Sequence, residues 1–259
     1  NEMFAIAYGL SMGSRAKNYT IENVTMENFL IGVYGRSLNL TLSNSDISKV
    51  EAGVNIMGGG NLTINGSRVV TEVTRNDKDL YAVRFGEGNS AGTPSVLGFH
   101  VAKSTLALNN PDSLAPAEGK YMRSVVLRGN AGGEMVVASS NIPQGIYNIS
   151  SVAITADGNW WGTADKPVAG TNYVGLVEFC SWLNAATPGG TPVFGNGQVK
   201  NERTGQIYCS IQSAVDDAEA DDSLLVGPGT FEENVLVNKK VKIIGSGNGE
   251  DPLVDTIVA

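Results

Sequence analysis

The stretch Thr20-Ile-Glu-Asn-Val-Thr-Met26 returns as Thr41-Leu-Ser-Asn-Ser-Asp-Ile47 and again as Thr63-Ile-Asn-Gly-Ser-Arg-Val69. The copies are offset by 21 and 22 residues. In each copy, apolar residues at the second and seventh positions flank a small polar segment, which is typical of a strand, a tight turn and the start of another strand. Short strands at a period near 22 residues, without helices between them, favour a parallel β-solenoid in which each coil stacks on the last.

Looser copies follow at His100–Leu106, Val136–Ile142 and Ile154–Trp160, with offsets of 37, 36 and 18 residues. Stacked coils place the same block position of every copy in one column, which predicts an interior ladder of Ile21, Leu42, Ile64, Val101 and Val137. Asn23 and Asn44 fall in a turn column, where side-chain amides are expected to hydrogen-bond from coil to coil. An antiparallel sandwich also has many short strands, but it has no reason to keep a 22-residue offset.

Composition agrees with an all-β chain and limits the function. The 259 residues include 32 glycines, only 17% are charged, and the net charge is −8. Because no run of Lys and Arg exceeds two residues, the basic stripe of a nucleic-acid-binding protein is missing. No apolar run approaches the roughly 18 residues that a membrane-spanning helix needs. The sequence therefore predicts neither nucleic-acid binding nor a membrane span.

Two further stretches carry a resemblance to a known fold family. Asp157-Gly-Asn-Trp-Trp-Gly-Thr-Ala-Asp-Lys-Pro167 with Val177-Glu-Phe-Cys-Ser-Trp-Leu183 is similar to the closing segment of extracellular β-helix repeat proteins. Ser210-Ile-Gln-Ser-Ala-Val-Asp-Asp-Ala-Glu-Ala220, followed by residues 222–245, looks like an opening segment. With the repeat, the chain resembles a right-handed parallel β-helix (solenoid) of the pectin-lyase-like type, with a short capping helix.

The resemblance implies three parts in an unexpected order: a β-helix body with its closing segment (1–183), a linker (184–205), and an opening cap helix with the first coils of a following β-helix (206–259). The cap helix is also expected from the residues, because Ile211, Ala214, Val215 and Ala218 recur at helical spacing. Two arrangements explain the order. Either the chain is a segment of a longer tandem array of modules, or its last part caps the next identical protomer in a head-to-tail filament.

Enzymes share this fold, but fold alone is no evidence for a reaction. Lyases need a basic proton acceptor and hydrolases need paired carboxylates, and the block columns contain neither an Asp pair in register nor an Arg ladder. We therefore expect no enzyme activity, no catalytic residue, no metal and no cofactor. The alternative is a carbohydrate-active or glycan-binding β-helix that acts through insertions at 70–122, with Asp77, Asp79, Arg84 and Glu87 as candidate ligand-binding residues.

Two features fit an extracellular or cell-surface protein. Cys180 and Cys209, the two cysteines, bracket the linker and are expected to form a disulfide, against the alternative of two independent thiols. Six Asn-x-Ser/Thr triplets are candidate N-glycosylation sites, although such triplets are also common in turn-rich repeats: Asn18, Asn23, Asn39, Asn61, Asn65 and Asn148.

The adjacent tryptophans of the closing segment receive separate roles. If the last block copy is Ile154–Trp160, Trp160 continues the seventh-position column of Met26 and Ile47 and points into the solenoid. Trp161 then faces the other way and packs near Trp182. The three rings are predicted to plug the last coil. The sequence as a whole predicts a non-enzymatic structural module of a surface fibre, filament or adhesin, with identical protomers or tandem modules as partners and glycans as further candidates.

Overall fold

The computed structural model describes residues 6–12, 17–86, 96–110, 114–129, 131–194, 198–250 and 255–258. Its contacts divide the chain into two compact units. The first contains residues 1–178 and 182–192, and the second contains residues 179–181 and 193–259. These boundaries differ from the predicted ones, because 182–192 lies in the first unit and two strands, β20 (Pro192–Phe194) and β21 (Val199–Asn201), occupy the predicted linker.

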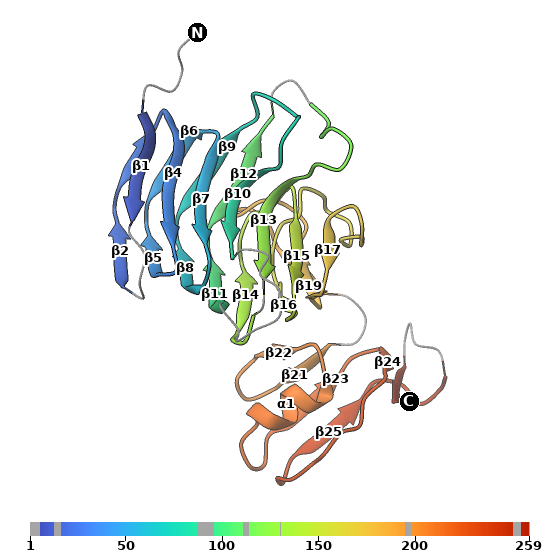
Figure 1. The fold of residues 1–259 in the computed structure, drawn as a ribbon. Coiled ribbons are helices and arrows are strands. Elements are labelled where there is room, and N and C mark those ends of the chain that lie inside the picture. Colours follow the sequence, from blue (N-terminus) through green and yellow to red (C-terminus); the bar gives the residue numbers. More distant parts are fainter. Residues whose placement is uncertain are drawn as a thin grey trace. The chain divides into compact units, whose positions relative to one another are not determined.

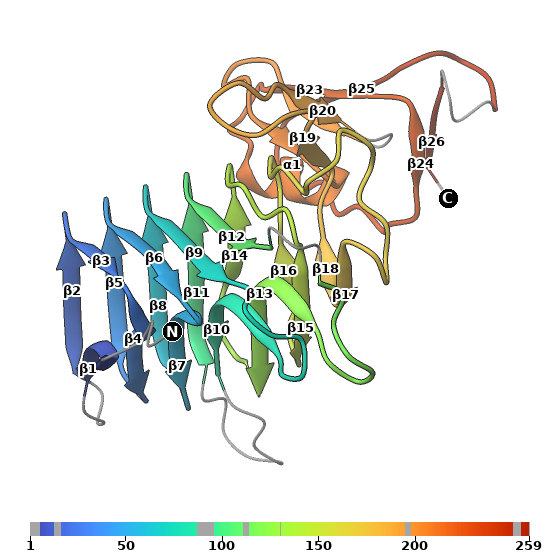
Figure 2. The ribbon, with the colours of Figure 1, turned by 90° about the horizontal axis from the view of Figure 1, so that it is seen from above.

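The first unit is a parallel β-helix built from three sheets (Figures 1 and 2). Sheet A has the strand order β1 (Ile6–Met12), β4 (Phe29–Arg36), β7 (Ala52–Met57), β10 (Leu80–Phe85), β13 (Met122–Gly129), β15 (Ile146–Ser150), β17 (Tyr173–Gly175). Sheet B has the order β2 (Asn18–Glu22), β5 (Asn39–Ser43), β8 (Gly60–Asn65), β11 (Val96–Ala102), β14 (Met135–Ala138), β16 (Ile154–Thr155), β18 (Val177–Glu178). Sheet C has the order β3 (Thr25–Glu27), β6 (Asp46–Val50), β9 (Arg68–Glu72), β12 (Thr105–Asn109). Figure 2 shows the coils following one another along the stack in chain order.

The seven-residue block is the corner between sheets B and C. Its second position forms the predicted interior column, in which Ile21 pairs with Leu42, then Ile64, Val101 and Val137, all buried. Its fourth position has a left-handed backbone in every described copy, with φ between 48° and 62°. That conformation favours Asn and Gly, which explains the turn residues of the repeat: Asn23, Asn44, Gly66, Lys103, Ser139 and Gly158.

The fifth position of the block forms a buried hydrogen-bonded column that we call the serine ladder: Ser45, Ser67, Ser104 and Ser140. Each hydroxyl accepts from the backbone N–H one coil back, at 3.1–3.2 Å, and donates to the carbonyl two residues before it. Asn159 ends the column, since its Oδ1 accepts from the backbone N of Ser140 at 2.9 Å. The ladder therefore satisfies the turn N–H groups that the corner buries.

A second polar column lies on the outer surface and is the asparagine ladder: Asn18, Asn39 and Asn61. The Asn39 Nδ2 donates to the Asn18 Oδ1 at 2.8 Å, and the Asn61 Nδ2 donates to the Asn39 Oδ1 at 2.9 Å. The amide ladder predicted for Asn23 and Asn44 is wrong: among the described residues these two positions connect coils through backbone N–H groups. In the strands of sheet B, by contrast, the side chains of Asn18, Asn39 and Asn61 stack from coil to coil.

The predicted orientation of the tryptophan pair is also wrong. Trp160 pairs with Asn141, which pairs with Thr105, so it holds the sixth block position and is half-buried. Trp161 is fully buried and takes the seventh position after Ile142. The last copy is therefore Thr155–Trp161, because Val136 pairs with Thr155 and not with Ile154. The nearest aromatic partner of Trp161 is Tyr173, at 6.2 Å between ring centroids.

The second unit combines one helix with short strands. The helix α1 (Ile211–Asp217) lies beside a sheet of the order β22 (Ile207–Tyr208), β21, β23 (Ser223–Val226), β25 (Lys242–Gly245). A second pair joins β24 (Gly229–Phe231) to β26 (Thr256–Val258). The strands β19 (Ser181–Leu183) and β20, which pair with each other, each contain residues of both units. The predicted apolar stripe of α1 is confirmed, because Ile211, Ala214, Val215 and Ala218 are all buried against Leu224 and Phe231.

The pairs β23–β25 and β24–β26 are both parallel. The consecutive strands β23 and β24 thus each pair with the strand two places later in the chain, which is the pattern of one coil stacking on another, as in the first unit. The second unit therefore contains two stacked strand pairs, and its core is covered by α1.

Candidate functional site

A cluster of tyrosine and arginine side chains lies on sheet A, where consecutive coils bring distant residues together. We call it the tyrosine-arginine patch, and it consists of Tyr81, Arg84, Tyr121, Arg128 and Tyr147. The rings of Tyr121 and Tyr147 stack at 4.7 Å with an interplanar angle of 21°. The guanidinium groups of Arg84 and Arg128 lie 5.8 Å and 5.5 Å from the rings of Tyr81 and Tyr121. Aromatic faces beside cations form a surface suited to binding polar ligands that carry apolar faces.

Hydrogen bonds and burial fix the charge state of the patch. Arg128 donates from Nη2 to the Tyr121 hydroxyl at 2.7 Å. Burial raises the pKa of Tyr121 to about 12 and also raises the pKa of Tyr81. Both phenols are therefore neutral at physiological pH, and they remain hydrogen-bond donors and acceptors.

Four buried polar atoms in and beside the patch lack hydrogen-bond partners among the described residues: the Oδ1 of Asn55 and the Nε of Arg84, Arg123 and Arg128. Asn55 pairs with Arg84 across β7 and β10, and Arg123 pairs with Tyr81 across β13 and β10. A buried polar atom without a partner costs about 1–3 kcal/mol. A ligand that supplied the missing partners would recover part of that cost.

The four predicted ligand-binding residues are only partly brought together. Arg84 belongs to the patch, and Asp79 lies 3.7 Å from Arg128. Asp77 instead pairs with Arg75 at 2.5 Å on an exposed turn, where the Arg75 hydrogen bond lowers the pKa of the carboxyl. Glu87 lies outside the described residues. Sequence reasoning missed the tyrosines, although Tyr81 and Tyr147 each lie in a strand of sheet A and Tyr121 directly precedes one.

A small hollow of about 160 Å³ borders the patch and is lined by Leu30, Ile31, Glu51, Ala52, Lys78, Asp79 and Tyr81. Its two carboxylates are paired with cations: Glu51 with Lys78 at 2.5 Å and Asp79 with Arg128. The hollow therefore combines charge with apolar walls, and its carboxylates are already engaged.

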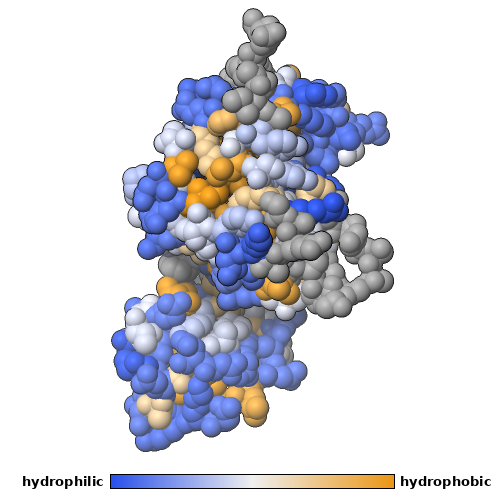
Figure 3. All heavy atoms as spheres, turned by 60° about the vertical axis from the view of Figure 1, so that its left-hand side comes forward, coloured by the Kyte–Doolittle hydropathy of each residue, from blue (hydrophilic) through white to orange (hydrophobic). Residues whose placement is uncertain are grey.

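The end of the first unit formed by β1, β2 and β3 is a second candidate surface among the described residues. β1, β2 and β3 are the edge strands of sheets A, B and C. Tyr8, Leu10 and Leu30 are exposed on this end, and Figure 3 shows apolar side chains gathered there between hydrophilic ones. An edge strand offers unpaired N–H and C=O groups to a further strand.

The second unit has a comparable edge at β25, where Ile243 and Ile244 are 40% and 46% exposed. Leu236 and Val237, in the loop before β25, are also exposed. A groove of about 390 Å³ runs beside this strand and is lined by Gln198, Lys200, Ile207, Leu225, Val226, Gly227, Ile244, Gly245 and Ser246.

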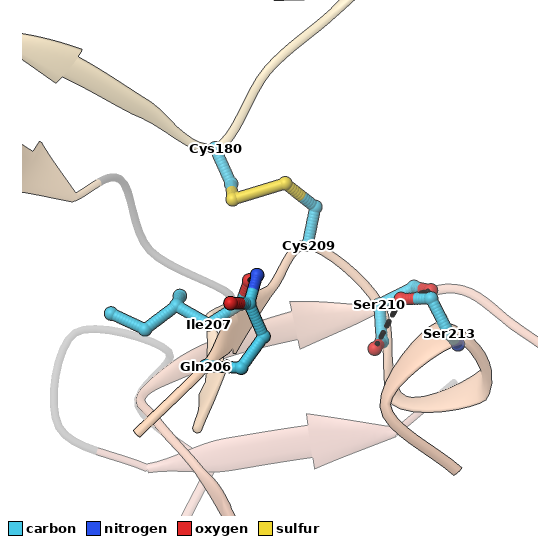
Figure 4. The surroundings of a disulfide bond; sticks show 6 residues. All are labelled: Cys180, Gln206, Ile207, Cys209, Ser210 and Ser213. Carbon is cyan, nitrogen blue, oxygen red and sulfur yellow. Dashed lines mark hydrogen bonds between the residues drawn. A yellow bond between two sulfur atoms is a disulfide. The ribbon is translucent and has the colours of Figure 1, made fainter. Parts of the chain in front are cut away.

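The two cysteines form a disulfide in the structure, with their Cα atoms 5.3 Å apart (Figure 4). Cys180 lies in the segment 179–181, which groups with the second unit, and Cys209 directly precedes the α1 N-cap residue Ser210. The Ser210 side chain accepts from the Ser213 backbone N. The carboxylate of Glu233 accepts from the backbone N of Ile211 and of Gln212. The disulfide and these contacts together fix the start of the cap helix.

A buried ion pair connects the strands behind the helix. Asp222 is 3% exposed and accepts from Arg203 at 2.5 Å and from Asn201 at 2.7 Å. These hydrogen bonds, that of Arg203 foremost, hold the pKa of Asp222 well below its usual range. Asp222 is buried although it is charged, because a carboxylate that accepts hydrogen bonds from two donors can be buried.

These observations define the class: a cysteine-bridged parallel β-helix protein with a capped second coil unit. No protein-family model matches the sequence, and no solved structure matches the fold. A stretch of 58 residues is 38% identical to a protein named "Cell surface glycoprotein" from Methanothermus fervidus. The match covers 22% of this chain and 10% of that protein. This similarity and the disulfide fit an extracellular or cell-surface location. Within the described ranges, no helix is long and apolar enough to cross a bilayer.

Proposed function

We propose that this protein is a non-enzymatic structural module of a cell surface, and that its β-helices join end to end with neighbouring β-helices, either of identical protomers or of tandem modules. The observation that carries the proposal is the position of the exposed apolar residues. Two of them lie on β1 (Tyr8 and Leu10), two lie on β25 (Ile243 and Ile244), and Leu30, Leu236 and Val237 lie near these strands, whereas Leu97, Ile149, Val168 and Leu176 lie elsewhere. The named relative and the disulfide support the surface location.

The joining is supported by the backbone as well as by the side chains. A parallel edge strand can accept one more strand in register, with main-chain hydrogen bonds that do not depend on side-chain identity. The contact would be heterologous, since the surface at β25 differs from that at β1, and such contacts propagate in one direction. A filament or fibre follows from repetition of this contact.

Native mass measurement and electron microscopy over a range of concentrations test this proposal. We expect species that grow with concentration, and filaments with a repeat of one module. Ile244→Lys should abolish them, because it places a charge on the joining edge. Ile149→Lys, also at an exposed apolar residue but in β15, is the matched control. A monomer at every concentration would contradict joining between protomers.

A second function, glycan binding, is favoured by the stacked pair Tyr121 and Tyr147 with Arg128 beside it. Calorimetric titration with neutral and acidic oligosaccharides tests it. Tyr147→Ala should remove the binding, whereas Tyr208→Phe in the second unit should leave it unchanged. Absence of heat with every oligosaccharide would refute this second function.

A further inference from the structure

The six Asn-x-Ser/Thr triplets are equivalent in sequence but occupy three different environments in the fold. In an N-glycan the sugar is attached to the side-chain Nδ2. The surroundings of that atom, and the space beside it, therefore decide which triplets the folded protein can carry in glycosylated form.

Asn148 is closed to modification. It is 1% exposed, and its Nδ2 donates both protons, to Val152 O at 2.8 Å and to Leu176 O at 2.6 Å. Its Oδ1 accepts from the backbone N and the hydroxyl of Ser150. A sugar on this nitrogen would break a buried hydrogen bond and would need space inside the coil.

Asn39 is the middle member of the asparagine ladder, and its amide has a neighbour on either side. Its Nδ2 donates to Asn18, and its Oδ1 accepts from the side chain and the backbone N of Asn61. Neighbouring strands lie about 4.8 Å apart, which leaves no room for a branched glycan between two amides that both contact it. A glycan on Asn39 would therefore disrupt the ladder.

Asn23 and Asn65, in contrast to Asn39 and Asn148, have side chains that are free of such contacts within the part of the chain that the structure describes. Both are exposed, and no hydrogen bond of either side chain is found among the described residues. The strand neighbours of Asn65 are the small residues Ser43 and Ala102. Asn23 lies at a left-handed turn, and the threonine of its triplet, Thr25, is exposed too. Both side chains are thus exposed and stand outside the asparagine ladder.

From this difference we propose that the protein carries N-linked glycans at Asn23 and Asn65 and none at Asn39 or Asn148. The inference does not depend on end-to-end joining. It assigns the glycans to one corner of the solenoid, the turn between sheets B and C, and it assigns the ladder triplet Asn39 to a structural role.

Site-resolved glycopeptide mass spectrometry tests this, on full-length protein from a host that N-glycosylates Asn-x-Ser/Thr triplets. We expect glycan on most copies of the Asn23 and Asn65 peptides and only unmodified Asn39 and Asn148 peptides. The proposal would be overturned if Asn23 and Asn65 carried no glycan, or if Asn39 or Asn148 carried one.

Two variants separate modification from folding. Thr25→Ala removes the Asn23 triplet and leaves Asn23 in place, so the intact mass should fall by one glycan. Thr41→Ala removes the Asn39 triplet but keeps the ladder, so the intact mass should change only by the substitution. Asn39→Ala should lower the melting temperature even in unglycosylated protein, whereas Asn65→Ala should not. A melting temperature that is insensitive to Asn39→Ala would refute the structural role of the ladder.

Discussion

The two units of this protein stabilise their buried polar groups in different ways. In the first unit one contact is copied from coil to coil, so that Ser45, Ser67, Ser104 and Ser140 make the same pair of hydrogen bonds. In the second unit each contact occurs once, as in the disulfide and the buried Asp222. The cost of a substitution is therefore set by block position in the first unit and by the individual residue in the second.

The largest effect is expected at the end of the repeated columns. Trp161→Ala removes a fully buried ring from the seventh-position column and should lower the free energy of unfolding by about 3–5 kcal/mol. Trp160→Ala, one residue away and half-buried, should cost much less. Chemical denaturation, with hydrogen exchange monitored in residues 131–178, measures the loss of unfolding free energy in both variants. Equal losses would show that the register deduced for the last coil is wrong.

A similar loss of unfolding free energy is expected in the second unit when the Cys180–Cys209 disulfide is removed. The disulfide closes a loop over a sequence separation of 29 residues, which contributes about 3–4 kcal/mol through chain entropy. Cys180→Ser should therefore destabilise the second unit, measured by hydrogen exchange in 199–231. Cys209→Ser should give the same loss, and the double variant should add nothing. A double variant that loses more than either single variant would contradict this.

The sequence predicted the interior column at the second block position because apolar residues recur there with a regular offset. It missed the register of the last coil, although a turn glycine was available: Gly158 aligned with Gly66 gives the copy Thr155–Trp161. The apolar residue at each end of the block was a weaker guide, since both Trp160 and Trp161 satisfy it. Turn residues fix register more firmly because few side chains accept a left-handed backbone.

The candidate sites were harder to predict, since they depend on neighbours in adjacent coils. The tyrosine-arginine patch joins residues from 81 to 147, and insertions of unequal length hide which of them share a surface. The same limit applies to Asp222, whose burial depends on Arg203 and Asn201 on the other side of α1 in the sequence. Local charge patterns describe a helix face but not the partner that covers it.

A smaller loss is expected for one step of the serine ladder. Ser104→Ala removes the hydroxyl that accepts from the backbone N of Ser67 at 3.1 Å. The N–H is then buried without a partner, which costs about 1–3 kcal/mol. Ser43→Ala, at a half-buried serine outside the ladder, is the control. Because the contact is repeated, Ser67→Ala and Ser140→Ala should lower the free energy of unfolding by similar amounts in the same denaturation experiment. Widely different values would contradict the view that block position sets the cost of a substitution in the first unit.

The smallest effect concerns pH and the ion pair of the second unit. The folded pKa of Asp222 lies below its unfolded value of about 3.9 because Arg203 and Asn201 donate to the carboxylate. Its contribution to stability is therefore complete above that pH and is lost as the pH falls toward the folded pKa. Asp222→Asn should flatten the acid limb of the stability curve of the second unit, measured by hydrogen exchange in 199–231. Asp221→Asn, at an exposed pair with Lys240, should leave that limb unchanged, because an exposed ion pair contributes little. An acid limb in Asp222→Asn equal to that of the unsubstituted protein would contradict this prediction. The buried ion pair of Asp222 would then not be a stabilising contact peculiar to the second unit.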